Sequence, residues 1–144
     1  MSSSVNSQLA KDMQWLGAAG LIPFMGLPFM YIAGHISKFE TSAYFVTYSA
    51  IILSFLGGIH WWDAYTRTQS RSQLYIAMLP SIAALFLSIA FSAFTAICLL
   101  ALCFLLQLIY DLYKLEANQM YRQLRSMLTG IVIGCHFVML WLLW

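Results

Sequence analysis

The chain has 144 residues, of which 62% are hydrophobic and 8% are charged, and its formal net charge is +2. About a quarter of the residues in a soluble domain are charged, so seven basic and five acidic residues are too few to cover a soluble fold of this size. The small, scattered charge also excludes a nucleic-acid-binding surface, and lipid is the solvent that suits this composition.

The apolar stretches are long enough to cross a membrane, which takes about 20 mainly apolar residues per helix. The first covers residues 15–33, and the second covers 43–62. No charged residue occurs in residues 74–110, a stretch too long for one crossing. We expect it to turn back near residues 92–95 and form spans at 74–91 and 94–113. With a last span at 127–144, the sequence predicts an all-α, polytopic integral membrane protein, a single-domain bundle of five transmembrane helices.

Basic residues gather at one end of these spans. Lys38 lies at the other end, and the rest share a face: Lys11, Arg67, Arg71, Lys114, Arg122 and Arg125. Short loops rich in Lys and Arg stay in the cytoplasm, so we expect a cytoplasmic N-terminus and a periplasmic C-terminus. The tryptophans divide between the same two interfaces, with Trp15, Trp61 and Trp62 at one and Trp141 and Trp144 at the other.

The N-terminal sequence bears on the type of membrane. The first apolar stretch follows Lys11 and Asp12 and contains Pro23 and Pro28, which is not typical of a signal peptide. The residues before it contain no Arg, unlike a mitochondrial presequence. We therefore predict a bacterial inner (plasma) membrane.

The first span is irregular, because Gly20, Pro23, Gly26 and Pro28 fall within nine residues. Proline removes a backbone donor and bends a helix, and a broken membrane helix can form a transport site. We favour the interpretation of a kinked packing helix, since no second broken span matches the first.

Small residues recur on two other spans. They are Ala50, Ser54, Gly57 and Gly58 on the second, and Ser126, Gly130 and Gly134 on the fifth. Such faces let membrane helices approach closely. We favour contact between these two spans within one subunit, with homodimerisation through the fifth helix as the alternative.

Polar residues near the cytoplasmic end form the candidate site. They are His60, Asp63, Gln107, Asp111, Arg122 and Arg125. Ionisable residues inside a membrane are usually paired and often functional. At interfacial depth, however, Asp63–Arg67 and Asp111 with Arg122 or Arg125 can simply be ion pairs that fix helix ends, and we favour this structural interpretation.

The other reactive residues indicate no chemistry. His136 lies on an apolar background, which is typical of a hydrogen-bonded packing residue. The three histidines form no metal-binding motif, and Cys98, Cys103 and Cys135 lack the spacing of a redox or metal site. We therefore predict no catalytic residue, no metal and no cofactor.

Several blocks of sequence follow one another along residues 15–130: Leu16-Gly17, Gly20 to Phe24, Tyr48, Leu53 to Trp61, Pro80, Gln107 with Asp111, Tyr121-Arg122, Leu124-Arg125 and Thr129. Together they resemble the DUF3429 family of small multi-span membrane proteins, which is related to transmembrane protein 69. Where the family pattern has Gly after His-Trp, this chain has Trp62. The resemblance implies a multi-span bundle in a bacterial or mitochondrial inner membrane and no established activity.

Three classes of function remain. We favour a non-enzymatic accessory or assembly subunit of a membrane complex, with the lipid bilayer and another membrane protein as partners and no nucleic acid. The alternatives are a small proton-linked transporter and a membrane enzyme that acts on a lipid or quinone at the cytoplasmic interface. Both alternatives predict that His60, Asp111 and Arg125 converge around one pocket.

Overall fold

The computed structural model describes residues 2–68, 71–114 and 119–144, and the regular structure within these ranges is helical. The elements are α1 (Ser2–Ala19), α2 (Ile22–Ile32), α3 (Lys38–Asp63), a short π-helical turn η1 (Ala64–Thr68), α4 (Arg71–Ala90), α5 (Ala93–Lys114) and α6 (Gln119–Leu143). Among the described residues, five helical stretches are long and apolar enough to cross a membrane, the first formed by α1 and α2 together. The predicted five-span, all-α architecture is confirmed.

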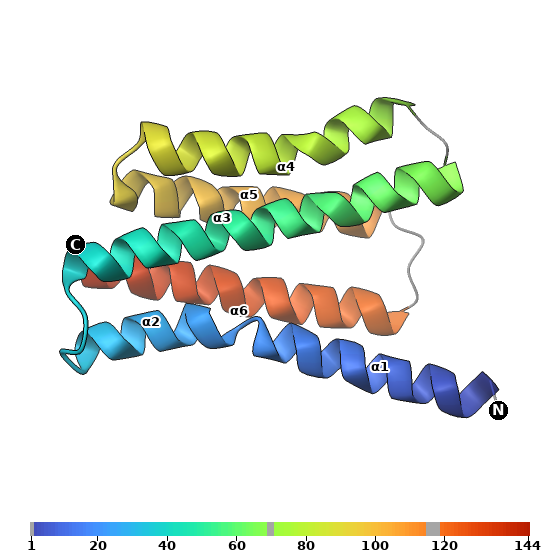
Figure 1. The fold of residues 1–144 in the computed structure, drawn as a ribbon, viewed down its shortest axis with the longest axis horizontal. Helices are drawn as coiled ribbons and strands as arrows, with labels where there is room; N and C mark the ends of the chain where they lie inside the picture. Colours follow the sequence, from blue (N-terminus) through green and yellow to red (C-terminus); the bar gives the residue numbers. More distant parts are fainter. Residues whose placement is uncertain (1, 69–70, 115–118) are drawn as a thin grey trace.

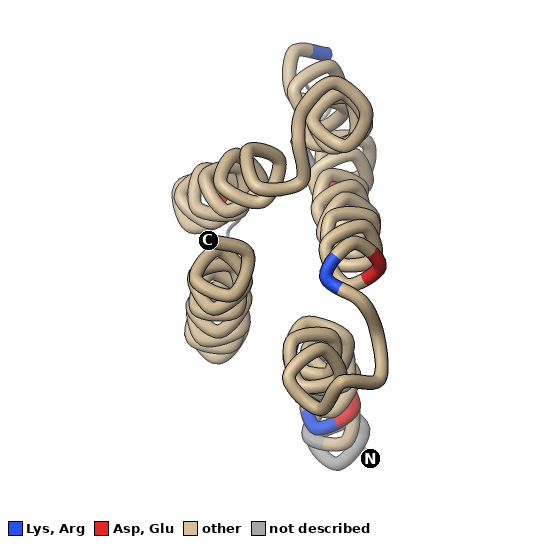
Figure 2. Tube along the Cα trace, turned by 90° about the vertical axis from the view of Figure 1, so that its left-hand side faces the viewer, with Lys and Arg blue, Asp and Glu red and all other residues tan. Residues whose placement is uncertain are grey.

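The spans run alternately up and down (Figure 1), so that the ends of α3 and α5 and the starts of α1, α4 and α6 lie at one end of the bundle. Seen along the bundle, the helices appear nearly end-on, with few charged positions along the tube (Figure 2). Several helices are longer than the expected spans. Arg125, expected before the last span, therefore lies within α6, whereas Asp111 lies near the end of α5, inside the expected fourth span.

Side chains cap two of the helices. The Ser37 hydroxyl accepts from the Glu40 amide, and the Glu40 carboxylate accepts from the Ser37 amide, which completes a capping box at the start of α3. Ser92 has the same position before α5, where its hydroxyl accepts from the amide of Thr95 at 3.4 Å. This cap allows the α4–α5 turn to form without Gly or Pro.

The break between α1 and α2 falls at Gly20 and Leu21. The Tyr48 hydroxyl of α3 donates to the Gly20 carbonyl at 2.9 Å, so an acceptor exposed by the break is satisfied inside the protein, as a bilayer requires. Pro23 stands in the first turn of α2, where a proline nitrogen costs no helical hydrogen bond. These contacts agree with a kinked packing helix.

Helix α3 is central and packs most extensively along α4, with further contacts to α5 and α2, while α6 packs mainly against α5. Gly57 makes the α3–α4 contact possible, since a Cβ there would stand 2.7 Å from the Ala77 carbonyl oxygen. Contact between α3 and α6 is slight. Among the described residues nothing lies within 4 Å of a Cβ built at Gly58, Gly130 or Gly134. Among the described residues, Gly57 thus faces α4 and Gly58 meets open space, and neither makes the expected contact with the last span.

Candidate functional site

The Asp111 carboxylate is the centre of a buried polar cluster that joins three helices. It accepts from His60 Nε2 of α3 at 2.5 Å, from Gln107 Nε2 of α5 at 3.0 Å and from Arg125 Nε of α6 at 2.5 Å. All four side chains are buried. A buried carboxylate is tolerated only when it is paired and hydrogen-bonded, and the Arg125 guanidinium supplies the balancing charge. We call these four residues the Asp111 cluster.

Arg125 also fixes the cluster to its own helix, because Nη1 donates to the Thr129 hydroxyl one turn further along α6, at 3.2 Å. The guanidinium therefore bridges α5 and α6 in one orientation. Such a fork of charge-assisted hydrogen bonds holds its partners more strictly than a lysine could.

The structure brings together four of the six expected site residues. Asp63 lies one turn beyond His60 and accepts from Gln73 Nε2 of α4 at 3.1 Å, while Arg122 is exposed on α6. Of the two expected partners of Asp111, Arg125 is therefore the one that pairs with it. The expected Asp63–Arg67 pair involves a side chain outside the described part of the chain.

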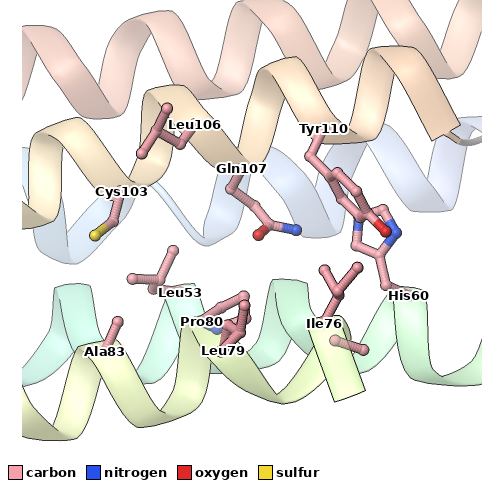
Figure 3. A pocket seen from close by; sticks show the side chains of 11 residues that line it. Leu53, His60, Ile76, Leu79, Pro80, Ala83, Cys103, Leu106, Gln107 and Tyr110 are labelled. Carbon is pink, nitrogen blue, oxygen red and sulfur yellow. The ribbon is translucent and has the colours of Figure 1, made fainter. Parts of the chain in front are cut away.

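A cavity of about 330 Å³ adjoins the cluster between α3, α4 and α5. Its walls are mainly apolar, including Leu53, Leu79, Pro80, Ala83, Cys103 and Leu106. Leu79 and Leu106 are more than half exposed, so the cavity opens on the lipid-facing side of the bundle. His60, Gln107 and Tyr110 form its polar end (Figure 3).

Two buried polar atoms at this end have no hydrogen-bond partner among the described residues. They are His60 Nδ1 and the Tyr110 hydroxyl, and the two rings lie 4.7 Å apart between centroids. A buried polar group without a partner costs about 1–3 kcal/mol, which is unusual in a native structure and indicates a place for function. Arg125 Nη2 is a third such atom, but Arg125 does not line the cavity.

Two residues of the site region, Gln73 beside Asp63 and Tyr110 in the cavity, were not predicted from the sequence. Gln73 and Tyr110 are uncharged and belong to no motif, so only their position near the ends of the expected third and fourth spans, at the same end of the bundle as the Asp111 cluster, could have identified them. Cys103 was expected as a small core residue and is a half-buried wall of the cavity.

His136 lies in a different environment deeper in the bundle. Nδ1 donates to the Val132 carbonyl at 2.8 Å, and Nε2 lies 3.3 Å from the Ser49 hydroxyl. The rings of Phe24, Phe45 and Phe104 surround the imidazole at centroid distances of 4.9 to 5.8 Å. His136 is thus a hydrogen-bonded packing residue, as expected.

The fold and site define a polytopic α-helical membrane protein with a charged cluster beside a lipid-facing cavity. The family model described as "Protein of unknown function (DUF3429)" matches residues 9–141, and the chain belongs to this family. No curated protein and no solved structure matches it.

Proposed function

We propose that this protein binds an amphipathic, lipid-soluble molecule of the lipid or quinone class in the cavity between α3, α4 and α5. The observation that carries the proposal is the orientation of His60. Its Nε2 is held by Asp111, which leaves Nδ1 unpaired at the polar end of an otherwise apolar cavity.

The shape of the cavity supports this function. Ligand sites are usually mostly apolar, with a few placed polar groups, and begin at about 300 Å³. The mouth at Leu79 and Leu106 faces hydrocarbon, so a ligand would diffuse in sideways from the bilayer with its tail along the apolar wall. Its head would then lie near the cytoplasmic end of the bundle.

Photocross-linking in nanodiscs tests this function. The probe is a ten-carbon alcohol that carries a diazirine in its chain, and the control variant is Leu85→Phe, which adds the same ring to the exposed outer face of α4. We expect saturable cross-links on α4 and α5 that disappear in Ala83→Phe, because the new ring fills the cavity, and persist in Leu85→Phe. Labelling that never saturates, or that is equal in the two variants, would contradict the function.

An accessory role in a membrane complex is a second candidate, supported by one observation. Ser126, Gly130 and Gly134 share an exposed face of α6, where side chains of a partner helix could reach the backbone. Gly130→Ile should fold normally, because a Cβ at Gly130 meets open space, and should lose a co-purifying partner by native mass spectrometry. Recovery of the wild-type protein only as a monomer in mild detergent would exclude this role.

No comparable observation favours the proton-linked transporter. That function would use the break in the first span, where the Tyr48 hydroxyl already occupies the Gly20 carbonyl. We therefore prefer binding of a lipid-soluble molecule.

We further propose a bacterial inner membrane, one of the two inner membranes that the resemblance to DUF3429 implies, with a cytoplasmic N-terminus, which the distribution of Lys and Arg supports. Alkaline phosphatase, which is active only outside the cytoplasm, should be active when fused after Trp144 and silent when fused after Lys114. The reverse pattern would overturn the orientation.

A further inference from the structure

We propose, on the basis of the proposed binding function, that the cavity selects an uncharged headgroup with a hydroxyl, which donates to His60 Nδ1 and accepts from the Tyr110 hydroxyl. Arg125 and Asp111 act as positioning residues that hold His60 ready as an acceptor. The class of ligand is therefore a phenol, hydroquinone or alcohol that bears an apolar tail.

The hydrogen on the imidazole is placed by Asp111. A carboxylate oxygen can only accept, so Nε2, which lies 2.5 Å from Asp111 Oδ1, carries the hydrogen. The same carboxylate is paired with Arg125 through its other oxygen, so its negative charge is already balanced. In a neutral imidazole, Nδ1 then carries a lone pair and no hydrogen, so it can only accept a hydrogen bond.

No described residue offers an acceptor to Nδ1, so a hydrogen on this nitrogen would have no partner. A protonated Nδ1 would be a buried cationic donor without a partner, which costs more than an unpaired neutral acceptor. The charged groups around His60 are Asp111 and Arg125, which pair with each other, and Asp63, which is hydrogen-bonded to Gln73 of α4. A ligand must therefore supply a donor to satisfy Nδ1.

Tyr110 supplies the complementary group. Its hydroxyl has no partner among the described residues, and its ring stands beside that of His60 at the same end of the cavity (Figure 3). One ligand hydroxyl can donate to Nδ1 and accept from Tyr110. Any charged head would lose its hydration against the apolar walls, so an uncharged head fits best.

Competition against the diazirine probe tests the selection in nanodiscs of phosphatidylcholine. 4-Decylphenol and 4-decylanisole have the same ring and tail, but the anisole cannot donate, and decanoate supplies a charged head. We expect the phenol to displace the probe at about one tenth of the anisole concentration, because loss of one buried hydrogen bond has roughly that effect. Decanoate should be the weakest competitor.

Tyr110→Phe removes only the hydroxyl and should weaken binding of both the phenol and the anisole about fivefold to tenfold, because the oxygen of either ligand can accept from Tyr110. The matched control is Tyr113→Phe on the exposed face of the same helix, which should change neither. Equal competition by phenol and anisole, both abolished by Ala83→Phe, would overturn the selection but leave the binding function intact. Competition by neither, with probe labelling unchanged in Ala83→Phe, would reject both.

Nitrogen-15 NMR of labelled histidine gives a readout that a merely structural role would not change. His35 and His136 are internal references. We expect His60 to carry hydrogen on Nε2 alone, and its Nδ1 resonance to move upfield when the phenol is added and not when the anisole is added. A doubly protonated His60, or an unchanged Nδ1 resonance with bound phenol, would overturn the proposal.

Discussion

Two fully buried histidines lie in two halves of one bundle. His60 lies in the half that holds the Asp111 cluster, which we call the charged half, and His136 lies in the half that holds Phe24, Phe45 and Phe104, which we call the aromatic half. The two histidines differ in what surrounds their second nitrogen. Both nitrogens of His136 have polar neighbours, and three phenylalanine rings enclose the imidazole. His60 has a carboxylate on one nitrogen and no described partner on the other, and it lines a cavity. Burial alone therefore does not distinguish a packing histidine from a binding one. The number of ring nitrogens that have a hydrogen-bond partner does.

The largest effect should come from the charged half. Asp111→Ala leaves Arg125 buried without its carboxylate and should lower the free energy of unfolding by about 3–5 kcal/mol, as measured by denaturation in mixed micelles. The double variant Asp111→Leu/Arg125→Met removes both charges and should be less destabilised than Asp111→Ala. A single variant as stable as wild type would show that the cluster is held open to water.

His136→Ala tests the aromatic half. The change opens a void among the phenylalanine rings and leaves the Val132 carbonyl with one partner fewer, so we expect a loss of about 2–4 kcal/mol. Displacement of the diazirine probe by 4-decylphenol should be unchanged in the folded fraction. A selective loss of phenol binding would mean that the two halves act together.

Two adjacent glycines of α3 differ in what surrounds them, because Gly57 faces α4 and Gly58 meets open space among the described residues. Gly57→Ala places a methyl group 2.7 Å from the Ala77 carbonyl oxygen, which should push α4 away, lower stability by about 1–3 kcal/mol and alter probe labelling. Gly58→Ala meets open space among the described residues and should change stability by less than about 0.5 kcal/mol. Equal effects would show that α3 and α4 are not packed as described.

A small loss of stability is expected at Tyr48, which contacts Phe24 in the aromatic half. Tyr48→Phe keeps the ring and removes the hydrogen bond to the Gly20 carbonyl, so stability should fall by about 1 kcal/mol. Thermal unfolding followed by circular dichroism measures this change, and phenol binding should be unaffected. A larger loss confined to binding would connect the break in the first span to the cavity.

Much of the fold could be predicted from the sequence, because lipid imposes a length and a composition on every span. Even the α4–α5 turn was expected close to its place, although the capping by Ser92 that forms it leaves no Gly or Pro signal. The helix ends were less predictable. Helices can continue past the hydrocarbon, so Arg125 was placed before the last span although it lies inside α6.

The candidate site was predictable only where charge marks it. Asp111 and Arg125 are conspicuous among apolar residues, but their pairing depends on helix rotation, which also carries Arg122 to the exposed surface. Gln73 and Tyr110 carry no charge, and the cavity is a product of how α3 approaches α4 at Gly57. The sequence gives the residues on each face of a helix, but it does not give which other helix packs against that face.

The joint between α1 and α2 gives the first span a property that the straight spans lack. The span consists of two rods that meet at Gly20 and Leu21, and α1 touches the rest of the bundle mainly through α6. A thicker or thinner bilayer is normally matched by tilting a whole helix. In this protein a change of angle at the joint would serve the same purpose, and α3, α4 and α5 would keep their spacing in membranes of different thickness.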